Sequence, residues 1–290
     1  MNSFELEILI KMANRGDINS SFLVGKYYAD NHEYGLAQKY LKPYADKGIS
    51  NFQAVLGMAY FNQGKIDIAK KYYILAADNG DAFSQNNLAY IYEMESEVDL
   101  AEKYWIMAAN NGVGEAPYNL GFLFFKEWDY GKSKKYHELA AKKGDRRSIK
   151  YLGKIALISS EFELAEKLLI MASKMDEPES FYLLGTLYDK DKKYDLAEKY
   201  YKIAIGLEIH KAHYMLSQIY SSEGKEKLAK EHLKLGADKG CSECQFHWGM
   251  QNIKLENFSI AYNYLLMAKE QGHRDANICF EMVWGSNNVQ

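Results

Sequence analysis

The chain has 290 residues, of which 48% are hydrophobic and 26% are charged, and its formal net charge is −3. This is the balance of a soluble globular protein, and it argues against a general nucleic-acid binder, whose surface is usually basic. No apolar run reaches the roughly 18 residues of a membrane span. The first residues lack a secretory signal, and the three cysteines are too few for a secreted disulfide framework, so we expect a cytoplasmic protein.

The first predicted element is a single helix over residues 4–15, where apolar residues recur at helical spacing. This segment aligns with the second helix of every unit that follows, and residues 272–285 align with a lone first helix. We expect these two half units to cap a repeat array, because terminal repeats are usually atypical.

Between the half units, the sequence repeats every 32 residues without an insertion. The boundary positions are Gly16, Gly48, Gly80, Gly112, Gly144, Asp176, Glu208, Gly240 and Gly272. A glycine just after a helix is typical of a left-handed C-terminal cap. Asp17, Asp81 and Asp145 follow three of these glycines and are expected to cap the N-terminus of the next helix.

Two further series of small residues keep the same period. Their members are Gly25, Gly57, Ala89, Gly121, Gly153, Gly185, Ser217 and Gly249, then Ala37, Ala69, Ala101, Ser133, Ala165, Ala197, Ala229 and Ala261. Small residues recur where helices cross closely, so each unit is predicted to hold two helices of about a dozen residues. The predicted fold is therefore all-α: an α-solenoid of antiparallel helix pairs that forms a single domain over 1–290. It comprises a capping helix at 1–15, eight 32-residue repeats at 16–271, and a capping helix and tail at 272–290.

The second unit carries a recognisable pattern: Leu56-Gly57-Met58-Ala59-Tyr60, then Ala69, Tyr73 and Ala76-Ala77-Asp78-Asn79-Gly80, with Ser84 and Leu88 beyond. It resembles the tetratricopeptide repeat family and, more closely, its Sel1-like branch. Two features depart from these families: the Gly-rich insert of Sel1-like units and the closing proline of tetratricopeptide repeats are both absent. The resemblance implies a right-handed superhelix and a scaffold that binds peptides or helices, with no enzymatic activity and no cofactor.

In solenoids of this family the first helix of each unit lines the concave groove. The resemblance therefore places a set of apolar residues there: Met58, Phe61, Tyr90, Tyr118, Phe122, Phe125 and Tyr182. Aromatic and methionine side chains are typical of peptide-binding grooves. The alternative is that superhelical curvature buries these side chains against one another.

Three cations, Arg147, Lys150 and Lys154, follow one helix face and are expected to attract a carboxylate or phosphate. The alternative is a solvated basic face. Together with the apolar residues, these cations predict a partner segment that is acidic next to a hydrophobic stretch.

One string resembles a metal site: Cys241-Ser-Glu-Cys244-Gln-Phe-His247, with His273 and Cys279 on the next helix. Cys244, however, occupies the small packing position that Ser148 and Ser180 fill elsewhere. A buried structural cysteine is therefore favoured over metal binding or redox chemistry, and no metal ligand is predicted.

The leading functional hypothesis is a scaffold or adaptor that binds a protein or peptide partner in its groove. Alternatives are a bacterial immunity or effector-partner protein and a peptide-sensing regulator, although no DNA-binding module accompanies the repeats. An RNA-binding helical repeat is disfavoured by the negative net charge. An enzyme is the weakest hypothesis, because no catalytic motif stands out. The oligomeric state is left open.

Overall fold

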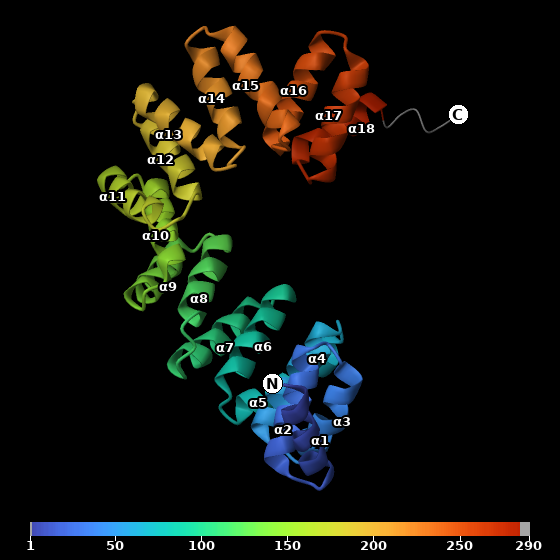
Figure 1. Cartoon of the computed structure of the whole chain (residues 1–290). Helices are drawn as coiled ribbons and strands as arrows, with labels where there is room; N and C mark the ends of the chain where they lie inside the picture. Colours follow the sequence, from blue (N-terminus) through green and yellow to red (C-terminus); the bar gives the residue numbers. More distant parts are fainter. Residues whose placement is uncertain (1, 285–290) are drawn as a thin grey trace. The chain divides into compact units, whose positions relative to one another are not determined.

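The computed structural model describes residues 2–284, and over that range the chain consists of helices joined by short turns (Figure 1). The chain divides into two compact units, Met1–Ser148 and Ile149–Gln290. Each unit is described by itself. The predicted tail after the last helix, residues 285–290, lies outside the described residues.

The helices of the first unit are α1 (Ser3–Asn14), α2 (Ile18–Asp30), α3 (Tyr34–Ala45), α4 (Ser50–Asn62), α5 (Ile66–Asp78), α6 (Ala82–Met94), α7 (Val98–Asn110), α8 (Ala116–Lys126) and α9 (Tyr130–Lys142). The division between the units falls in α10 (Arg146–Ile158). The second unit continues with α11 (Phe162–Ser173), α12 (Glu179–Lys190), α13 (Tyr194–Gly206), α14 (Ala212–Ser222), α15 (Glu226–Asp238), α16 (Ser242–Lys254), α17 (Phe258–Glu270) and α18 (Arg274–Trp284).

Even-numbered helices are the first of each pair and are called A helices here; odd-numbered helices from α3 onward are called B helices. A helices pack against the B helix that follows, as α4 does against α5 and α12 against α13, and within each unit most B helices pack against the next A helix. The prediction of an all-helical solenoid is confirmed. No helix among the described residues combines the length and apolar character needed to cross a bilayer.

The turns between repeats contain a residue in the left-handed region. The predicted glycine caps are confirmed, since Gly16 and Gly80 have φ values of 93° and 84°. At two boundaries without glycine, Asp176 and Glu208 adopt the same conformation, with φ values of 58° and 64°. The turn geometry is therefore kept even where the chain bears a side chain there.

A second left-handed series, which the sequence did not reveal, lies in the turns inside the repeats. Its members are His32, Gly64, Ser96, Trp128, Ser160, Lys192, Gly224 and Glu256. Backbone hydrogen bonds hold these turns: the N–H of Glu33, for example, donates to the carbonyl of Tyr28 at 2.8 Å. Only two of these residues are glycine, so the sequence shows no recurring glycine that would mark these turns.

The predicted aspartate caps are also confirmed. The carboxylates of Asp17, Asp81 and Asp145 accept hydrogen bonds from the backbone N–H three residues further on, at 2.7, 2.6 and 3.0 Å. Each bond satisfies one of the open N–H groups at the start of an A helix.

The small residues in the A helices lie where a large B-helix side chain crosses them. A Cβ added to Gly121 would lie 2.7 Å from the His137 ring, and one added to Gly185 would lie 2.5 Å from the Tyr201 ring. Both distances are shorter than van der Waals contact, so the predicted close crossings are present. His137 and Tyr201 are fully buried at these crossings.

Candidate protein-binding surface

The A helices line one face of each unit. Within the first unit α2 contacts α4 and α4 contacts α6, and within the second unit α14 contacts α16, whereas successive B helices approach one another less closely. A stack whose A helices lie closer together than its B helices curves toward the A side. Where these contacts are made, the A-helix side is therefore the inner side of the stack.

Six predicted residues belong to three A helices of the first unit, α4, α6 and α8: Met58, Phe61, Tyr90, Tyr118, Phe122 and Phe125, called here the aromatic patch. None of them is fully buried, and Tyr90 is the most open, with 36% of its surface exposed. Met58 and Phe61 also pack against the hydrophobic core. The six side chains are therefore partly buried and partly exposed to solvent.

The Tyr118 and Phe122 rings are parallel, with centroids 6.4 Å apart. The Arg147 guanidinium lies 3.9 Å from the centre of the Tyr118 ring, a cation–π contact. Its Nη2 also lies 2.6 Å from Oδ2 of Asp145, the cap of α10. Arg147 is therefore held at the edge of the patch with part of its charge already balanced.

A polar layer supports the patch from within. Oδ1 of Asn86 accepts hydrogen bonds from Nε1 of Trp105 at 3.1 Å and from Nδ2 of Asn119 at 3.4 Å. The Tyr90 ring packs edge-on against Trp105, with centroids 5.3 Å apart. Burial raises the pKa of Tyr90, so its hydroxyl stays protonated at neutral pH. This asparagine pair was not predicted; its signal in the sequence is Asn86, a polar residue in a register that holds Ala54 and Tyr118 in the neighbouring repeats.

A second cation at the patch was also missed. The ammonium of Lys126 lies 5.4 Å from the centre of the Phe122 ring and forms an ion pair with Glu93 at 2.6 Å. The Tyr130 ring packs against Phe125, with ring centroids 5.5 Å apart. The aromatic patch is therefore flanked by Arg147 and Lys126, each with a carboxylate partner.

The other three predicted residues, Lys150, Lys154 and Tyr182, lie in the second unit. The charge of Lys150 is already paired, because its ammonium lies 3.0 Å from a carboxylate oxygen of Glu177 and 3.4 Å from one of Glu179.

Lys211 extends this network. It pairs with Glu179 at 2.8 Å and lies 4.3 Å from the centre of the Tyr182 ring. Burial alone would raise the pKa of Glu179, but Lys211, Lys150 and Lys154 together hold it below its usual value. Burial lowers the pKa of Lys154, and repulsion from the positive charges of Lys211 and Lys150 lowers this pKa further.

This charged network could have been found from register. Glu179 and Lys211 occupy the same position in successive repeats and carry opposite charges. The pattern of cations along one helix does not reveal the carboxylates that the next repeat supplies.

The cysteine string has clear structural roles. Cys241 caps the N-terminus of α16 and Cys244 is fully buried, as the packing-position argument predicted. Among residues 2–284, no group of three or more His, Cys, Asp or Glu side chains is placed to hold a metal ion.

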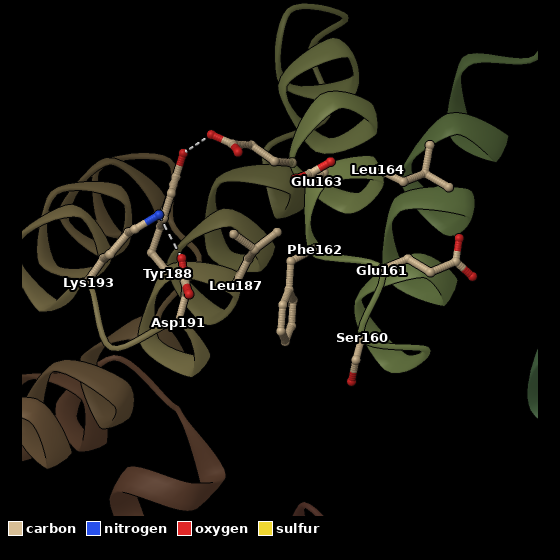
Figure 2. Close-up of a pocket in the computed structure, with 10 residues that line it drawn as sticks. Ser160, Glu161, Phe162, Glu163, Leu164, Leu187, Tyr188, Asp191 and Lys193 are labelled. Atoms are coloured by element: carbon tan, nitrogen blue, oxygen red, sulfur yellow. Dashed lines mark hydrogen bonds and ion pairs between the residues drawn. The ribbon is translucent and has the colours of Figure 1, made fainter.

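A pocket of about 600 Å³ lies in the second unit, beside the ends of α11 and α12 (Figure 2). The Tyr188 hydroxyl donates to Glu166 at 2.5 Å, and Lys193 pairs with Asp191 at 2.7 Å; both are dashed in Figure 2. Phe162 occupies the middle of the lining. The first contact links α12 to α11, and the second is a local pair in the turn between α12 and α13.

Regular helix pairs, left-handed turns and small residues at the crossings define the class of protein, an α-helical repeat solenoid. The family model "Tetratricopeptide repeat" matches residues 51–78, 178–208 and 210–237. Three segments of the chain therefore match the tetratricopeptide repeat model, and the helical repeat fold extends over the described residues on either side of them.

Solved structures of Sel1 repeat and other proteins have a similar fold. A Sel1 repeat protein from Oxalobacter formigenes is 19% identical with a TM-score of 0.69, over 98% of this chain and 91% of that chain. The protective antigen c5321 of uropathogenic Escherichia coli, described as having an SLR fold, is 18% identical with a TM-score of 0.65, over 97% and 68%. The Cut9–Hcn1 hetero-tetramer of the APC/C contains a chain that is 17% identical with a TM-score of 0.54, over 91% and 52%. A search of curated proteins finds no match.

Proposed function

We propose that this chain is an interaction scaffold or adaptor that binds a peptide or helix of a partner protein on its A-helix face. Repeats of this family are general protein–protein interaction scaffolds and are typically not enzymes. The observation that carries the proposal is the aromatic patch, in which several partly exposed rings and Met58 lie on consecutive A helices. Contiguous apolar surface of this kind is characteristic of interaction sites.

The chemistry of the patch defines the partner segment. An apolar anchor side chain would displace water from the ring edges and supply most of the affinity. Arg147 and Lys126 flank the rings, so acidic residues beside the anchor would be oriented by them. Because both cations already have carboxylate partners, we expect their contribution to be modest.

Lys150, Lys154 and Tyr182 enter the proposal as a further contact region in the second unit. A ligand carboxylate would have to compete there with Glu177 and Glu179. Its binding free energy would therefore be smaller than at a cluster of lysines without carboxylate partners.

Two observations fit this role. The solenoid in the Cut9–Hcn1 structure is named as part of a hetero-tetramer, and assembly with another chain is what we propose here. The three cysteines are free thiols, which fits a cytoplasmic setting.

The test begins with a partner captured from native cells and identified by mass spectrometry. Calorimetry then compares the wild type with Phe122→Ala, which should weaken binding by about 1–3 kcal/mol at any salt concentration. Phe258→Ala is the matched control, because Phe258 is an exposed phenylalanine on a B helix and should have no effect on binding.

Lys150→Glu should weaken binding mainly at low salt, because screening reduces the contribution of a partly exposed charge. If Phe122→Ala and Lys150→Glu both fold and bind as tightly as the wild type, the A-helix face is not the binding surface and the proposal fails.

A further inference from the structure

The start of α16 differs chemically from the start of other A helices. Asp17 with Ser20, Asp81 with Ser84, and Asp145 with Ser148 each provide an aspartate cap and a buried serine three residues later. In α16 the same two positions are Cys241 and Cys244. The scaffold therefore offers a direct comparison: one repeat carries two thiols where others carry a carboxylate and a hydroxyl.

The two sulfur atoms interact. Sγ of Cys241 accepts a hydrogen bond from the backbone N–H of Cys244 at 3.3 Å, and the Cys244 thiol donates a second one to it. Residues three apart at the start of a helix have Cα atoms roughly 5 Å apart. This separation lies inside the range that a disulfide spans, so the bond can form with little backbone movement.

The packing around Cys244 is adapted to sulfur. A Cβ added to Gly236 would clash with Sγ of Cys244. The equivalent position is Tyr44 in the first repeat and an alanine in six others: Ala76, Ala108, Ala140, Ala172, Ala204 and Ala268. The missing methyl group at residue 236 thus provides the space that the larger sulfur atom needs.

The two thiols differ in reactivity. Hydrogen bonds from the Cys244 thiol and from its backbone N–H lower the pKa of Cys241, against the opposing effect of burial. The hydrogen bond to Cys241 and burial raise the pKa of Cys244. Cys241 retains 9% of its surface exposed and Cys244 none. Cys241 is therefore the thiol that a small oxidant can reach, and Cys244 would act as the resolving cysteine.

We propose that Cys241 and Cys244 form a redox-active dithiol, which hydrogen peroxide converts into a reversible disulfide at the N-terminus of α16. The Cys241 thiolate attacks one peroxide oxygen, the O–O bond breaks, and a sulfenic acid forms on Cys241. The hydroxide released takes up the proton that Cys241 lost and leaves as water.

The sulfur of Cys244 then attacks the sulfenic sulfur of Cys241, and the S–O bond breaks. The Cys244 proton passes to the departing hydroxide, which leaves as a second water. Two thiols are thereby oxidised by two electrons, and one peroxide is reduced to two waters. A thiol reductant reverses the change by exchange through a mixed disulfide.

The experiment treats the folded full chain with hydrogen peroxide, blocks the remaining thiols with N-ethylmaleimide, and maps the peptides by mass spectrometry. We expect the Cys241–Cys244 cross-link to form while Cys279 is still alkylated, and dithiothreitol to restore all three thiols. The cross-link should form at least about tenfold faster in the folded chain than in the chain unfolded in urea, because only the fold lowers the pKa of Cys241.

The chain supplies its own control variants. Cys241→Asp and Cys244→Ser install the residues that other repeats use, so both should melt near the wild-type temperature and neither should form the cross-link. Peroxide should leave Cys244→Ser with a sulfenic acid on Cys241 that dimedone traps. Cys279→Ser should form the cross-link at the wild-type rate.

Three results would each overturn the proposal. The first is full alkylation of Cys241 and Cys244 after a peroxide dose that oxidises the unfolded chain. The second is a cross-link no faster in the folded chain than in the unfolded one, a comparison that needs no variant. The third is a disulfide that forms through Cys279 instead.

Discussion

The inner faces of the two units use the same positions for different chemistry. Tyr118 and Phe122 in α8 occupy the register that Lys150 and Lys154 occupy in α10. In the first unit this register builds a stack of aromatic rings, and in the second it builds a network of ion pairs. The repeat therefore fixes where a side chain stands, while the residue at that position decides whether the surface suits an apolar or a charged ligand.

The close helix crossings are what the two units share, and they give the largest expected effect. Gly121→Leu in the first unit and Gly185→Leu in the second should each destabilise the protein by about 2–4 kcal/mol through overpacking. Urea denaturation measures this loss. A loss in one unit alone would show that the two crossings are not equivalent.

Gly131→Leu is the matched control for this pair, because Gly131 is exposed in α9 and a Cβ there meets only Asp129 at 3.5 Å. It should leave stability unchanged or raise it slightly, since leucine is the better helix former.

Acid sensitivity is a second shared property. Burial lowers the pKa of His137 in the first unit and of His213 in the second to about 4. His137 is hydrogen-bonded to Ser148 at 3.1 Å, and His213 to His232 at 3.1 Å. Each buried histidine is neutral in the fold, whereas the unfolded chain protonates it below about pH 6.5.

The stability contributed by these histidines is therefore complete above about pH 6.5 and is lost as the pH falls toward 4, by up to about 3 kcal/mol for each one. His137→Gln and His213→Gln should each flatten the dependence of unfolding free energy on pH over that window. An unchanged slope in either variant would show that the histidine is protonated in the folded state as well.

Salt should separate the two inner faces. Glu179→Gln removes the carboxylate shared by Lys150 and Lys211 and should cost about 0.5–1 kcal/mol at low salt, and less at high salt. The destabilisation caused by Phe122→Ala should depend less on salt, because the stacked rings gain mainly from packing and Lys126 adds only one charged contact. Thermal melts at two ionic strengths make the comparison, and a salt-independent Glu179→Gln effect would contradict it.

The smallest expected effect concerns the turns inside the repeats. Ser160 has a φ of 60°, a conformation that costs little only for glycine. Ser160→Gly should therefore stabilise the second unit by about 0.5–1 kcal/mol. Ser159→Gly, one residue earlier and not in the left-handed region, should not stabilise it, and equal effects at both positions would refute the strain argument.

The sequence predicted the helices, their period and the glycine-marked turns, because helix faces and left-handed caps leave a pattern that repeats every 32 residues. It did not predict the turn series of Ser160 and Trp128, since turns held by backbone hydrogen bonds need no particular residue.

The candidate surface was predicted less completely. The positions of its residues follow from register, but the partners of Lys150 come from the next repeat, and a search along one helix does not find them. The partial burial of Tyr118 and Phe122 depends on the spacing between helices, which the sequence pattern does not give.

The constant turn geometry has a consequence for how such a chain can change its length. At six boundaries the left-handed residue stands two positions before the first residue of an A helix, so these junctions are alike: Gly16, Gly48, Gly80, Gly144, Gly240 and Gly272. Deleting residues 49–80 would join Gly48 to Asp81, a junction of the same kind as Gly80 with Asp81. Unequal recombination can therefore remove or duplicate one whole repeat without disturbing the helices on either side, which allows a lineage to lengthen or shorten its inner face in steps of one repeat.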